Sequence, residues 1–508
     1  MAVEQTPLVH RLSDLLAGFA AVDPARDRDV RGLANDSRRV RPGDLFLARA
    51  GQRTHGLDFL REALQAGAVA VAWEPLGAAP NGQRSWQPPA PDPRVPMFGI
   101  EGLGGKIGVI ADRFYAHPSR ALFVIGITGT DGKTSCSQFL AQALSGDLER
   151  CGVIGTLGYG LYGQLQAAAH TTPDALTLQS LLADMRDRGV RRVVMEVSSH
   201  SLEQERVSGV AFDVAVLTNL TRDHLDYHGD QAAYARAKRR LFETPGLHYA
   251  VINADDAFGR ELLSALPAEV RAYGYSLDPA GGAQVRSADL RMTDTGFEMY
   301  VVTPWGEGRL RSGLLGRFNA GNLLAALSVL LIMDVPLPEA LQRLGRTATV
   351  PGRMERFGGG PGRPLVVVDY AHTPEALSQV LQELRRHCTG ELWCVFGCGG
   401  ERDAGKRPLM GAGAERHADR VVVTDDNPRH EDPTQIVIDI LLGMRDPDAA
   451  YIRRERGQAI AFAIEQARPG DVVLVAGKGH EEYQLIGDRT LSFSDRERVA
   501  ELLDKVWP

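Results

Sequence analysis

A short glycine-rich segment, residues 129–134, combines residue types that suit the binding of a nucleoside triphosphate. Its glycines, Gly129 and Gly132, allow backbone N–H groups to curve around phosphate oxygens, and a following helix would add its positive end. Lys133 could neutralise the outer phosphates, and the hydroxyl of Thr134 could hold Mg²⁺. An apolar run precedes the segment and helical periodicity follows it, so the sequence predicts a phosphate-binding loop rather than an ordinary glycine turn.

The composition is that of a large globular enzyme with more than one domain. The chain has 508 residues, too many for one hydrophobic core, so we expect about two to four domains. A net charge of -7 gives no basic footprint for nucleic acid, and no stretch reaches the roughly 20 apolar residues of a membrane span. Five scattered cysteines and the lack of a signal-peptide pattern favour a reducing cytoplasm.

Apolar runs alternate with amphipathic stretches along most of the chain, which predicts an α/β fold in three blocks, residues 1–120, 121–349 and 350–508. The second block is expected to form a parallel sheet of the P-loop ATPase kind, and the third a Rossmann-like domain. Continuous apolar runs suit strands that are buried on both faces. The expected strands lie at 44–48 in the first block, at 121–126, 192–196, 214–217 and 248–252 in the second, and at 364–369, 392–396, 420–423 and 472–476 in the third.

The phosphate loop and several other segments resemble the Mur ligases and their relative, folylpolyglutamate synthase. Residues 126–134 are similar to the ATP-binding signature of this family, although Asp131 stands where the family usually has asparagine. A carboxylate at this position would repel phosphate unless a cation offsets it. The resemblance covers essentially the whole chain, because further segments match in the family's order: 35–38, 42–46, 195–200, 218–226, 316–322 and 369–374.

The resemblance implies an ATP-dependent acid–amino-acid ligase with three domains, Mg²⁺ as cofactor and ATP as co-substrate. An N-terminal α/β domain would bind a UDP-sugar, a central domain ATP, and a C-terminal domain the amino acid, with a hinge near 350–352. A carboxylate would be activated as an acyl phosphate, which an amine then attacks. We expect small-molecule substrates, no nucleic acid, no membrane insertion, a monomer, and a cytoplasmic role in peptidoglycan precursor synthesis.

Residues 426–429 are similar to the signature of the diaminopimelate-adding type of the family. The far end of meso-diaminopimelate carries an extra carboxylate, which the guanidinium of Arg429 can grip with two hydrogen bonds. Lysine has only an ammonium there, and Arg429 would repel it. The substrates implied are therefore ATP, UDP-N-acetylmuramoyl-L-alanyl-D-glutamate and meso-diaminopimelate.

Family positions also imply the residues of the catalytic centre. The catalytic residues would be Lys133, Glu196, His224 and Lys238. Mg²⁺ would be bound by Thr134 at one site and by Glu196 and His224 at a second, where Lys238 would join them as a carbamate, N6-carboxylysine. Lys238 stands in a basic, helix-like segment whose pattern alone indicates a solvated lysine. The ATP-binding residues would be Gly129, Thr130, Asp131, Gly132, Lys133, Thr134, Ser135, Asn319, Asn322 and Arg353.

The resemblance to the family also implies two further sets of binding residues. The UDP-N-acetylmuramoyl dipeptide would contact Asn35, Ser37, Gln52, Arg53, Thr54, Thr171, Thr172, Ser198, Gln204 and Arg206. Diaminopimelate would contact Arg402, Asp426, Asn427, Pro428, Arg429, Gly477 and Glu481. Each of these residues, taken alone, could be an ordinary polar residue on the protein surface. For residues 426–429 the simple alternative is an Asx-Pro turn.

Three alternatives stay open at this point. A sibling ligase that adds L-lysine differs at Arg429, and folylpolyglutamate synthase would have no use for the N-terminal block or for residues 426–429. A non-catalytic nucleotide-binding protein would have no need to keep Lys133, Glu196 and Lys238 together.

Overall fold

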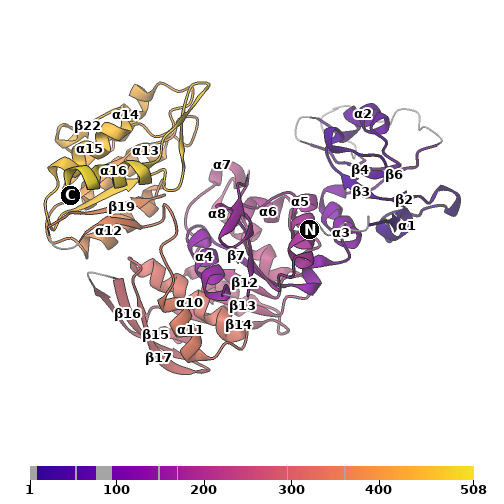
Figure 1. Cartoon of the computed structure of the whole chain (residues 1–508), viewed down its shortest axis with the longest axis horizontal. Helices are drawn as coiled ribbons and strands as arrows, with labels where there is room; N and C mark the ends of the chain where they lie inside the picture. Colours follow the sequence, from indigo (N-terminus) through magenta and orange to yellow (C-terminus); the bar gives the residue numbers. More distant parts are fainter. Residues whose placement is uncertain are drawn as a thin grey trace.

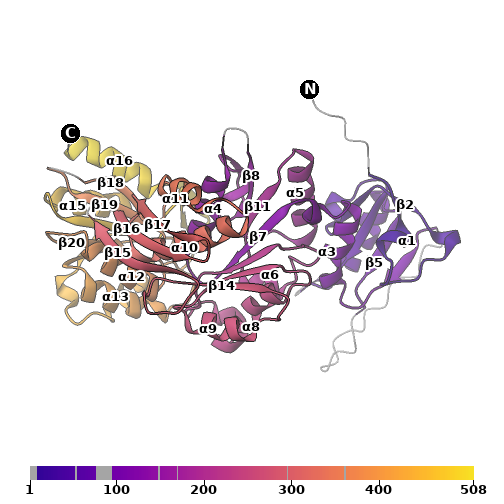
Figure 2. The ribbon, with the colours of Figure 1, turned by 90° about the horizontal axis from the view of Figure 1, so that it is seen from below.

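The computed structural model describes residues 8–51, 54–75, 94–146, 149–168, 170–293, 296–359 and 362–507. The molecule is elongated and contains three successive α/β units, with the indigo N-terminal unit and the yellow C-terminal unit at opposite ends (Figures 1 and 2). Within these ranges no helix has the length and apolar character needed to cross a membrane. The α/β class expected from the sequence is confirmed. The domain boundaries at 120/121 and 349/350 fall in the segments that join one sheet to the next, and they stay predictions.

The N-terminal unit is built on a four-stranded parallel sheet in the order β3-β4-β5-β6. Its strands are β3 Gly32–Ala34, β4 Asp44–Ala48, β5 Ala70–Trp73 and β6 Met97–Gly99. The helices are α1 Leu12–Leu15, α2 Leu60–Gln65 and α3 Leu103–Phe114, and a small sheet pairs β1 His10–Arg11 with β2 Asp29–Val30. All five residues of β4 are buried, which explains the apolar run read from the sequence.

The central unit has an 11-stranded sheet in the order β10-β9-β8-β11-β7-β12-β13-β14-β15-β16-β17. The strands from β8 to β15 in this order are parallel, and antiparallel strands extend both edges. The strands are β7 Phe123–Thr128, β8 Cys151–Gly155, β9 Gly158–Leu161, β10 Gln164–Gln166, β11 Arg192–Glu196, β12 Val214–Leu217, β13 Tyr249–Asn253, β14 Arg271–Ser276, β15 Val285–Thr293, β16 Gly296–Thr303 and β17 Gly306–Ser312. The expected parallel sheet is therefore present, but its antiparallel edges were not foreseen.

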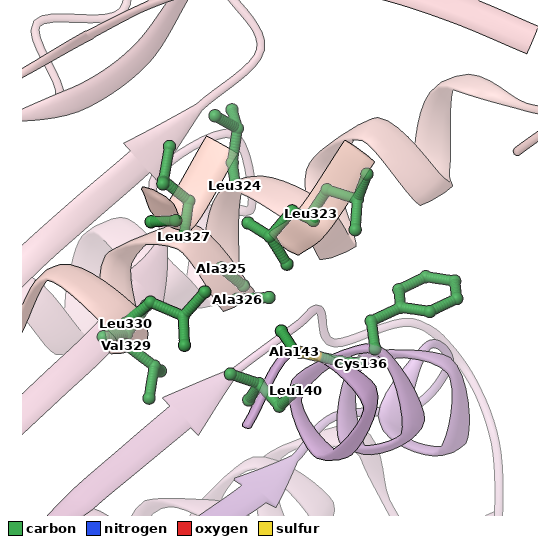
Figure 3. Close-up of a cluster of buried hydrophobic side chains, with 14 of the residues drawn as sticks. Cys136, Leu140, Ala143, Leu323, Leu324, Ala325, Ala326, Leu327, Val329 and Leu330 are labelled. Atoms are coloured by element: carbon green, nitrogen blue, oxygen red, sulfur yellow. The ribbon is translucent and has the colours of Figure 1, made fainter. Parts of the chain in front are cut away.

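Helices cover the central sheet and carry the segments that matter for the site. They are α4 Lys133–Leu144, α5 Ala175–Asp187, α6 Ser199–Glu203, α7 Leu225–His228, α8 Gln231–Arg239, α9 Ala257–Ala265, α10 Arg317–Ile332 and α11 Leu337–Gly345. Helix α10 is apolar around most of its circumference, as expected of a helix enclosed by its neighbours. Figure 3 shows its Ala326 and Leu330 on the side toward Leu140 and Ala143 of α4. This packing fixes the helix that begins at the phosphate loop.

The C-terminal unit contains a six-stranded sheet in the order β18-β19-β23-β20-β21-β22, parallel except for the edge strand β18. Its strands are β18 Glu355–Gly358, β19 Leu365–Asp369, β20 Leu392–Phe396, β21 Arg420–Val423, β22 Tyr451–Ile452 and β23 Val472–Ala476. Helices α12 Pro374–Arg385, α13 Lys406–His417, α14 Pro433–Leu441, α15 Arg456–Gln466 and α16 Asp495–Val506 surround it, and β24 Tyr483–Ile486 pairs with β25 Arg489–Ser492 as a hairpin. The four strands expected from apolar runs are all present.

A buried ion pair joins three elements of the C-terminal unit. Arg456 opens α15 and Asp495 opens α16, and both side chains are fully buried. Two hydrogen bonds of 2.7 Å link the guanidinium to the carboxylate, and a third, of 2.9 Å, reaches the carbonyl of Ala476 at the end of β23. The pair therefore fixes the point at which the chain leaves β23 for Gly477.

Candidate active site

The phosphate loop connects the end of β7 with the start of α4. Gly132 has φ +79° immediately before α4, a conformation that glycine adopts without strain. Gly129 packs so closely on the neighbouring loop that a Cβ there would lie 1.8 Å from Oγ1 of Thr218. Thr218 also donates a 2.6 Å hydrogen bond to the carbonyl of Asp131, and Asn219 accepts one of 2.9 Å from its N–H. The loop after β12 thus shapes the phosphate loop.

Gly129→Ala is expected to destabilise this region by about 1–3 kcal/mol and to weaken ATP binding, because the added Cβ would have to displace Thr218. Melting temperatures with and without ATP measure both effects. Gly146→Ala is a suitable control, since a Cβ at Gly146 meets nothing within 4 Å. Equal melting behaviour of the two variants would contradict the close packing.

Lys133 folds back over its own loop. Its Nζ donates hydrogen bonds to the carbonyls of Gly129 (2.8 Å) and Thr130 (2.7 Å). Burial lowers the pKa of Lys133, whereas the charges of Glu196 and Asp131 act in the opposite direction. An ammonium in this position can exchange loop carbonyls for phosphate oxygens with a short movement, because it is a compact charge on a flexible stem.

Asp131 has two kinds of partner for its carboxylate. The hydroxyl of Thr221 donates a long hydrogen bond of 3.4 Å to its Oδ2. Its charge also raises the pKa of both Lys133 and Lys238, which places the carboxylate within the field of two lysines. The ammonium of Lys133 supplies the offset that an aspartate beside a triphosphate requires.

Glu196 and Thr134 belong to one oxygen cluster. Glu196 ends β11 and is 1% exposed, and its Oε2 accepts hydrogen bonds from the hydroxyls of Thr134 (2.9 Å) and Thr156 (3.1 Å). The N–H of Thr156 donates to Oε1 at 2.8 Å. The sequence predicts that Thr134 and Glu196 bind different Mg²⁺ ions. Their direct contact brings the two oxygens to one place, and the assignment of each to an ion stays a prediction.

Lys238 is buried rather than solvated, which corrects the expectation from its basic segment. It lies on α8, its side chain is 1% exposed, and its Nζ donates a 2.6 Å hydrogen bond to the carbonyl of Gly129. The ring of Tyr234 lies 4.4 Å from the Nζ. Burial first, and the charge of Lys133 second, lower the pKa of Lys238 well below its ordinary value. The amine is therefore neutral at a pH where an ordinary lysine is charged.

His224 lies near Lys238 at the start of α7. Its backbone is left-handed, with φ +53°, and its Nε2 lies 3.3 Å from Oδ2 of Asp223. The imidazole ring makes edge contacts with His200 at 4.8 Å and with Tyr234 at 6.1 Å between centroids. Contacts on both sides hold the ring beside the phosphate loop.

A cavity of about 550 Å³ brings these residues together with the C-terminal unit. Its wall includes most of the expected catalytic and ATP-binding side chains from the central unit: Thr130, Asp131, Gly132, Lys133, Thr134, Ser135, Glu196, His224, Lys238, Asn319 and Asn322. The C-terminal unit contributes Arg353, Asp369, Tyr370 and His372, among others. Gly129 of the expected set lies behind the wall, where its carbonyl binds the two lysines.

The C-terminal side of the cavity is arranged around Asp369 and Arg353. Asp369 ends β19, accepts hydrogen bonds from the N–H groups of Met354 (2.7 Å) and Ala371 (2.8 Å), and has its pKa raised by burial. The guanidinium of Arg353 lies 4.4 Å above the ring of Tyr370. Its Nε is buried without a hydrogen-bond partner in the described part of the chain, which suits a donor for an anionic ligand.

Part of the expected dipeptide site also lines the cavity, namely Thr171, Thr172, Ser198 and Arg206. Gln204 lies behind Arg206 and accepts hydrogen bonds of 2.9 and 2.6 Å from its guanidinium. In the N-terminal unit, Asn35 donates a 3.1 Å hydrogen bond to Asp174, two residues after Thr172, so this unit contacts the same loop.

The remaining N-terminal positions contact residues of their own unit. Ser37 donates a 2.8 Å hydrogen bond to Glu62, and the carbonyl of Thr54 accepts one of 2.9 Å from Gly51. Gln52 and Arg53 lie outside the described residues.

A second polar cluster lies where β20, β21 and β23 end. The amide of Asn427 donates a 3.0 Å hydrogen bond to Glu481, and the N–H of Leu485 donates one of the same length to Oδ1 of Asn427. Arg429 has φ +54° and donates a 2.7 Å hydrogen bond to the carbonyl of Gly400. Arg402 is exposed beside it, whereas Asp426 and Pro428 are buried in the same loops and Asp426 approaches Gly477. The structure thus gathers the expected diaminopimelate residues at one edge of the sheet.

The two clusters are connected through Tyr370 and His480. Tyr370 lines the cavity, and its ring centroid lies 5.4 Å from that of His480, the residue before Glu481. Burial, aided by the charge of Arg353, lowers the pKa of His480 to about 4. The loop from Gly477 to Glu481 also packs on the linker before β18, because a Cβ on Gly352 would lie 2.1 Å from the N–H nitrogen of His480.

Sequence reasoning missed several residues of the cavity. Thr156, His200 and Tyr234 line it. His200 ends the matching segment 195–200 but received no role, and Thr156 and Tyr234 belong to no motif that indicates chemistry. Tyr234 and Lys238 are four residues apart on α8, the spacing at which helical side chains share a face, and this was the available signal. Thr156 follows β8, whose short apolar run was not recognised.

The fold and the cavity define a three-domain α/β enzyme that uses a nucleoside triphosphate. Three family models match the chain: "Mur ligase family, catalytic domain" over residues 29–115, "Mur ligase middle domain" over 127–330, and "Mur ligase, glutamate ligase domain" over 352–479. The chain is also 52% identical over 500 residues to the UDP-N-acetylmuramoyl-L-alanyl-D-glutamate–2,6-diaminopimelate ligase of Alkalilimnicola ehrlichii, covering 97% of this chain and 98% of the relative. It therefore belongs to the Mur ligase family.

Further relatives agree with this membership. The ligase of the same name from Pseudomonas aeruginosa is 51% identical over 482 residues, with 94% of this chain and 96% of the relative covered. A solved structure of a ligase of this name is 36% identical, covers 98% of this chain and 99% of its own, and has a TM-score of 0.71. The MurF ligase of Thermotoga maritima in complex with ADP has a TM-score of 0.62 at 21% identity, with 95% of this chain and 99% of that chain covered, and it supports the fold alone.

Proposed function

We propose that this chain joins meso-2,6-diaminopimelate to the γ-carboxylate of D-glutamate in UDP-N-acetylmuramoyl-L-alanyl-D-glutamate, at the expense of ATP. The observation that carries this proposal is the cavity in which Lys133, Glu196 and Lys238 of the central unit face Arg353 and Asp369 of the C-terminal unit. Relatives that bear this enzyme name are about half identical over nearly the whole chain. The cluster around Arg429 supports the choice of amino acid.

The reaction would take place in two displacements. An oxygen of the D-glutamate γ-carboxylate attacks the γ-phosphorus of ATP, and the bond from this phosphorus to the β-phosphate oxygen breaks. ADP departs, and the γ-carboxylate has become an acyl phosphate. The amine of diaminopimelate then attacks the acyl carbon, inorganic phosphate leaves, and the amine loses a proton as the amide forms. Such chemistry depends on positioning and on neutralisation of charge. Lys133 and Arg353 are placed to supply both.

Oxygen groups beside the phosphate loop would suit Mg²⁺, which takes mainly oxygen ligands. Thr134 and Glu196 would hold one ion together, because a hydroxyl and a carboxylate that already touch match its preference for oxygen ligands. Lys238, as a carbamate, and His224 would hold a second ion. Bound Mg²⁺ would neutralise phosphate charge during the transfer. The low pKa of Lys238 supports the carbamate, because CO₂ adds only to a neutral amine.

The amino-acid site would use the cluster at the ends of β20, β21 and β23. Arg429, with Arg402 beside it, would bind the carboxylate at the far end of diaminopimelate, and Glu481 would bind its ammonium. L-Lysine would bring an ammonium without a carboxylate and leave the arginines unpaired. The same argument separates this ligase from its lysine-adding sibling.

The enzyme would act in the cytoplasm, where its nucleotide-linked substrate and ATP occur together, and we propose that it works as a monomer. Its product would be a precursor of peptidoglycan. The activity would therefore support cell-wall synthesis, cell shape and cell division.

Phosphate release with ATP, Mg²⁺ and UDP-N-acetylmuramoyl-L-alanyl-D-glutamate tests the function directly. We expect release to require meso-diaminopimelate and to yield the UDP-linked tripeptide by mass spectrometry, with L-lysine giving a rate lower by about 10²-fold or more. An equal rate with L-lysine would overturn the choice of amino acid. Absence of release with every amino acid tested would overturn the assignment as a ligase.

A further inference from the structure

A fully buried lysine lies beneath the amino-acid cluster. Lys478 follows β23, its side chain is 0% exposed, and its Nζ donates hydrogen bonds to Oε2 of Glu481 (2.9 Å) and to Oδ1 of Asn427 (3.1 Å). Asn427 closes the triangle by donating to the same Oε2 at 3.0 Å. A charge buried this deeply requires such partners, since desolvation is costly. Lys478 therefore joins the loop after β21 to the loop after β23.

The triangle determines how Glu481 presents its carboxylate. Both hydrogen bonds reach Oε2, so Oε1 takes part in neither. The carboxylate of Glu481 is 18% exposed, whereas Lys478 is enclosed. A ligand ammonium can thus approach Glu481 from the open side, while Lys478 holds the other oxygen from within the protein.

The ring of Tyr483 also belongs to this cluster. The Nζ of Lys478 lies 5.4 Å from the ring centroid. Burial raises the pKa of the Tyr483 phenol, the charges of Glu481 and Asp426 raise it further, and those of Arg429 and Arg402 oppose the rise. The positive charge of Lys478 therefore lies in the same cluster as those of Arg429 and Arg402.

We propose that Lys478 is a specificity-determining residue for the amino-acid substrate, because its buried ammonium already pairs with Glu481 from within the protein and thereby disfavours a side chain that ends in a lone ammonium. The inference rests on the proposed function. Diaminopimelate ends in an ammonium and a carboxylate, which together add no net charge. L-Lysine adds one positive charge beside a carboxylate that Lys478 already pairs with. Specificity of this kind combines attraction for one ligand with repulsion of its competitor.

Lys478→Met and Lys478→Gln test this role in the full-length enzyme. Both remove the charge, and glutamine retains a hydrogen-bond donor for Glu481. We expect the KM for meso-diaminopimelate to rise about tenfold or more with kcat nearly unchanged, because a buried charge partner is lost from the binding site. L-Lysine is tested as an inhibitor that competes with meso-diaminopimelate. The ratio of its inhibition constant to the KM for meso-diaminopimelate should be lower by about tenfold or more in both variants than in the unaltered enzyme. Lys505→Met, which removes an exposed charge from α16 of the same unit, should change neither constant.

A double variant separates charge from packing. Lys478→Met with Glu481→Gln removes one charge of each sign and returns the net charge to its original value. Discrimination against L-lysine should therefore return toward that of the unaltered enzyme, although meso-diaminopimelate binds weakly. A ratio of the two constants that stays within about twofold of the original in both single variants would overturn the proposal. The proposed function fails separately, if the unaltered enzyme shows no release that depends on meso-diaminopimelate.

Discussion

Lys238→Ala is expected to lower the rate of ATP-dependent ligation by about 10²- to 10³-fold, because the variant loses the group that would carry the carbamate beside the phosphate loop. The amine is enclosed, touches the carbonyl of Gly129 and has a pKa well below its ordinary value. The lowered pKa makes the neutral amine, to which CO₂ adds, available at a lower pH than in an ordinary lysine, and the carbamate so formed is an anion. Phosphate release at saturating substrates measures the loss.

Chemical rescue distinguishes the carbamate from a simple loss of packing. Formate or acetate fits the space that alanine leaves, and a bound carboxylate would replace the missing anion, so activity should recover in part. ¹³C NMR of the unaltered enzyme with labelled CO₂ should show a carbamate signal that Lys238→Ala lacks. Lys505→Ala serves as the control on an exposed position. A signal equal in both proteins, or no rescue by any small carboxylate, would contradict the proposed modification.

Asp495→Asn is expected to destabilise the C-terminal unit by about 3–5 kcal/mol, because Arg456 would remain buried with its charge uncompensated. Both side chains are 0% exposed, and NH1 of Arg456 has no hydrogen-bond partner among the described residues even with Asp495 in place. Hydrogen exchange of α15 and α16 in the full chain measures the loss. We also expect a higher KM for diaminopimelate, since Arg456 holds the carbonyl of Ala476 beside Gly477.

Two further variants make this prediction specific. Asp504→Asn changes the same residue type at an exposed position of α16 and should leave exchange unchanged. Replacing Arg456 and Asp495 together by leucine removes both charges and should recover part of the stability, because no charge is then left unpaired. If the amide hydrogens of α15 and α16 exchange at the same rate in Asp495→Asn as in Asp504→Asn, the Arg456–Asp495 ion pair does not stabilise the C-terminal unit.

The sequence predicted the parallel cores of the sheets well, for a physical reason. Strands such as β7, β20 and β23 are buried on both faces and consist of continuous apolar residues. Most of the missed strands lie toward the edges, where one face meets solvent and polar residues interrupt the pattern, but β8 and β14 of the parallel part were missed as well. In β15, for example, exposed and buried positions alternate irregularly around a bulge between Ser287 and Asp289.

The sequence predicted which residues belong to the candidate site better than it predicted which of them contact one another. The phosphate loop carries a local signal, since strand, glycines, lysine and helix follow one another directly. The contact between Thr134 and Glu196 joins residues 62 positions apart, and only the sheet order β8-β11-β7 brings them together. Lys238 and Lys478 look like ordinary surface lysines in the sequence, because the elements that bury them are distant along the chain.

Gly352, in the linker before β18, packs against the backbone of the loop at Gly479 and His480. This contact gives the linker a second structural role. The segment about which we expect the C-terminal unit to turn also supports the loop that we propose holds the amino acid. Rotation of that unit and delivery of the amine would then be a single mechanical event rather than two. An acyl phosphate made in this way would meet its nucleophile at the moment the domains shut, which limits the time that water has to destroy it.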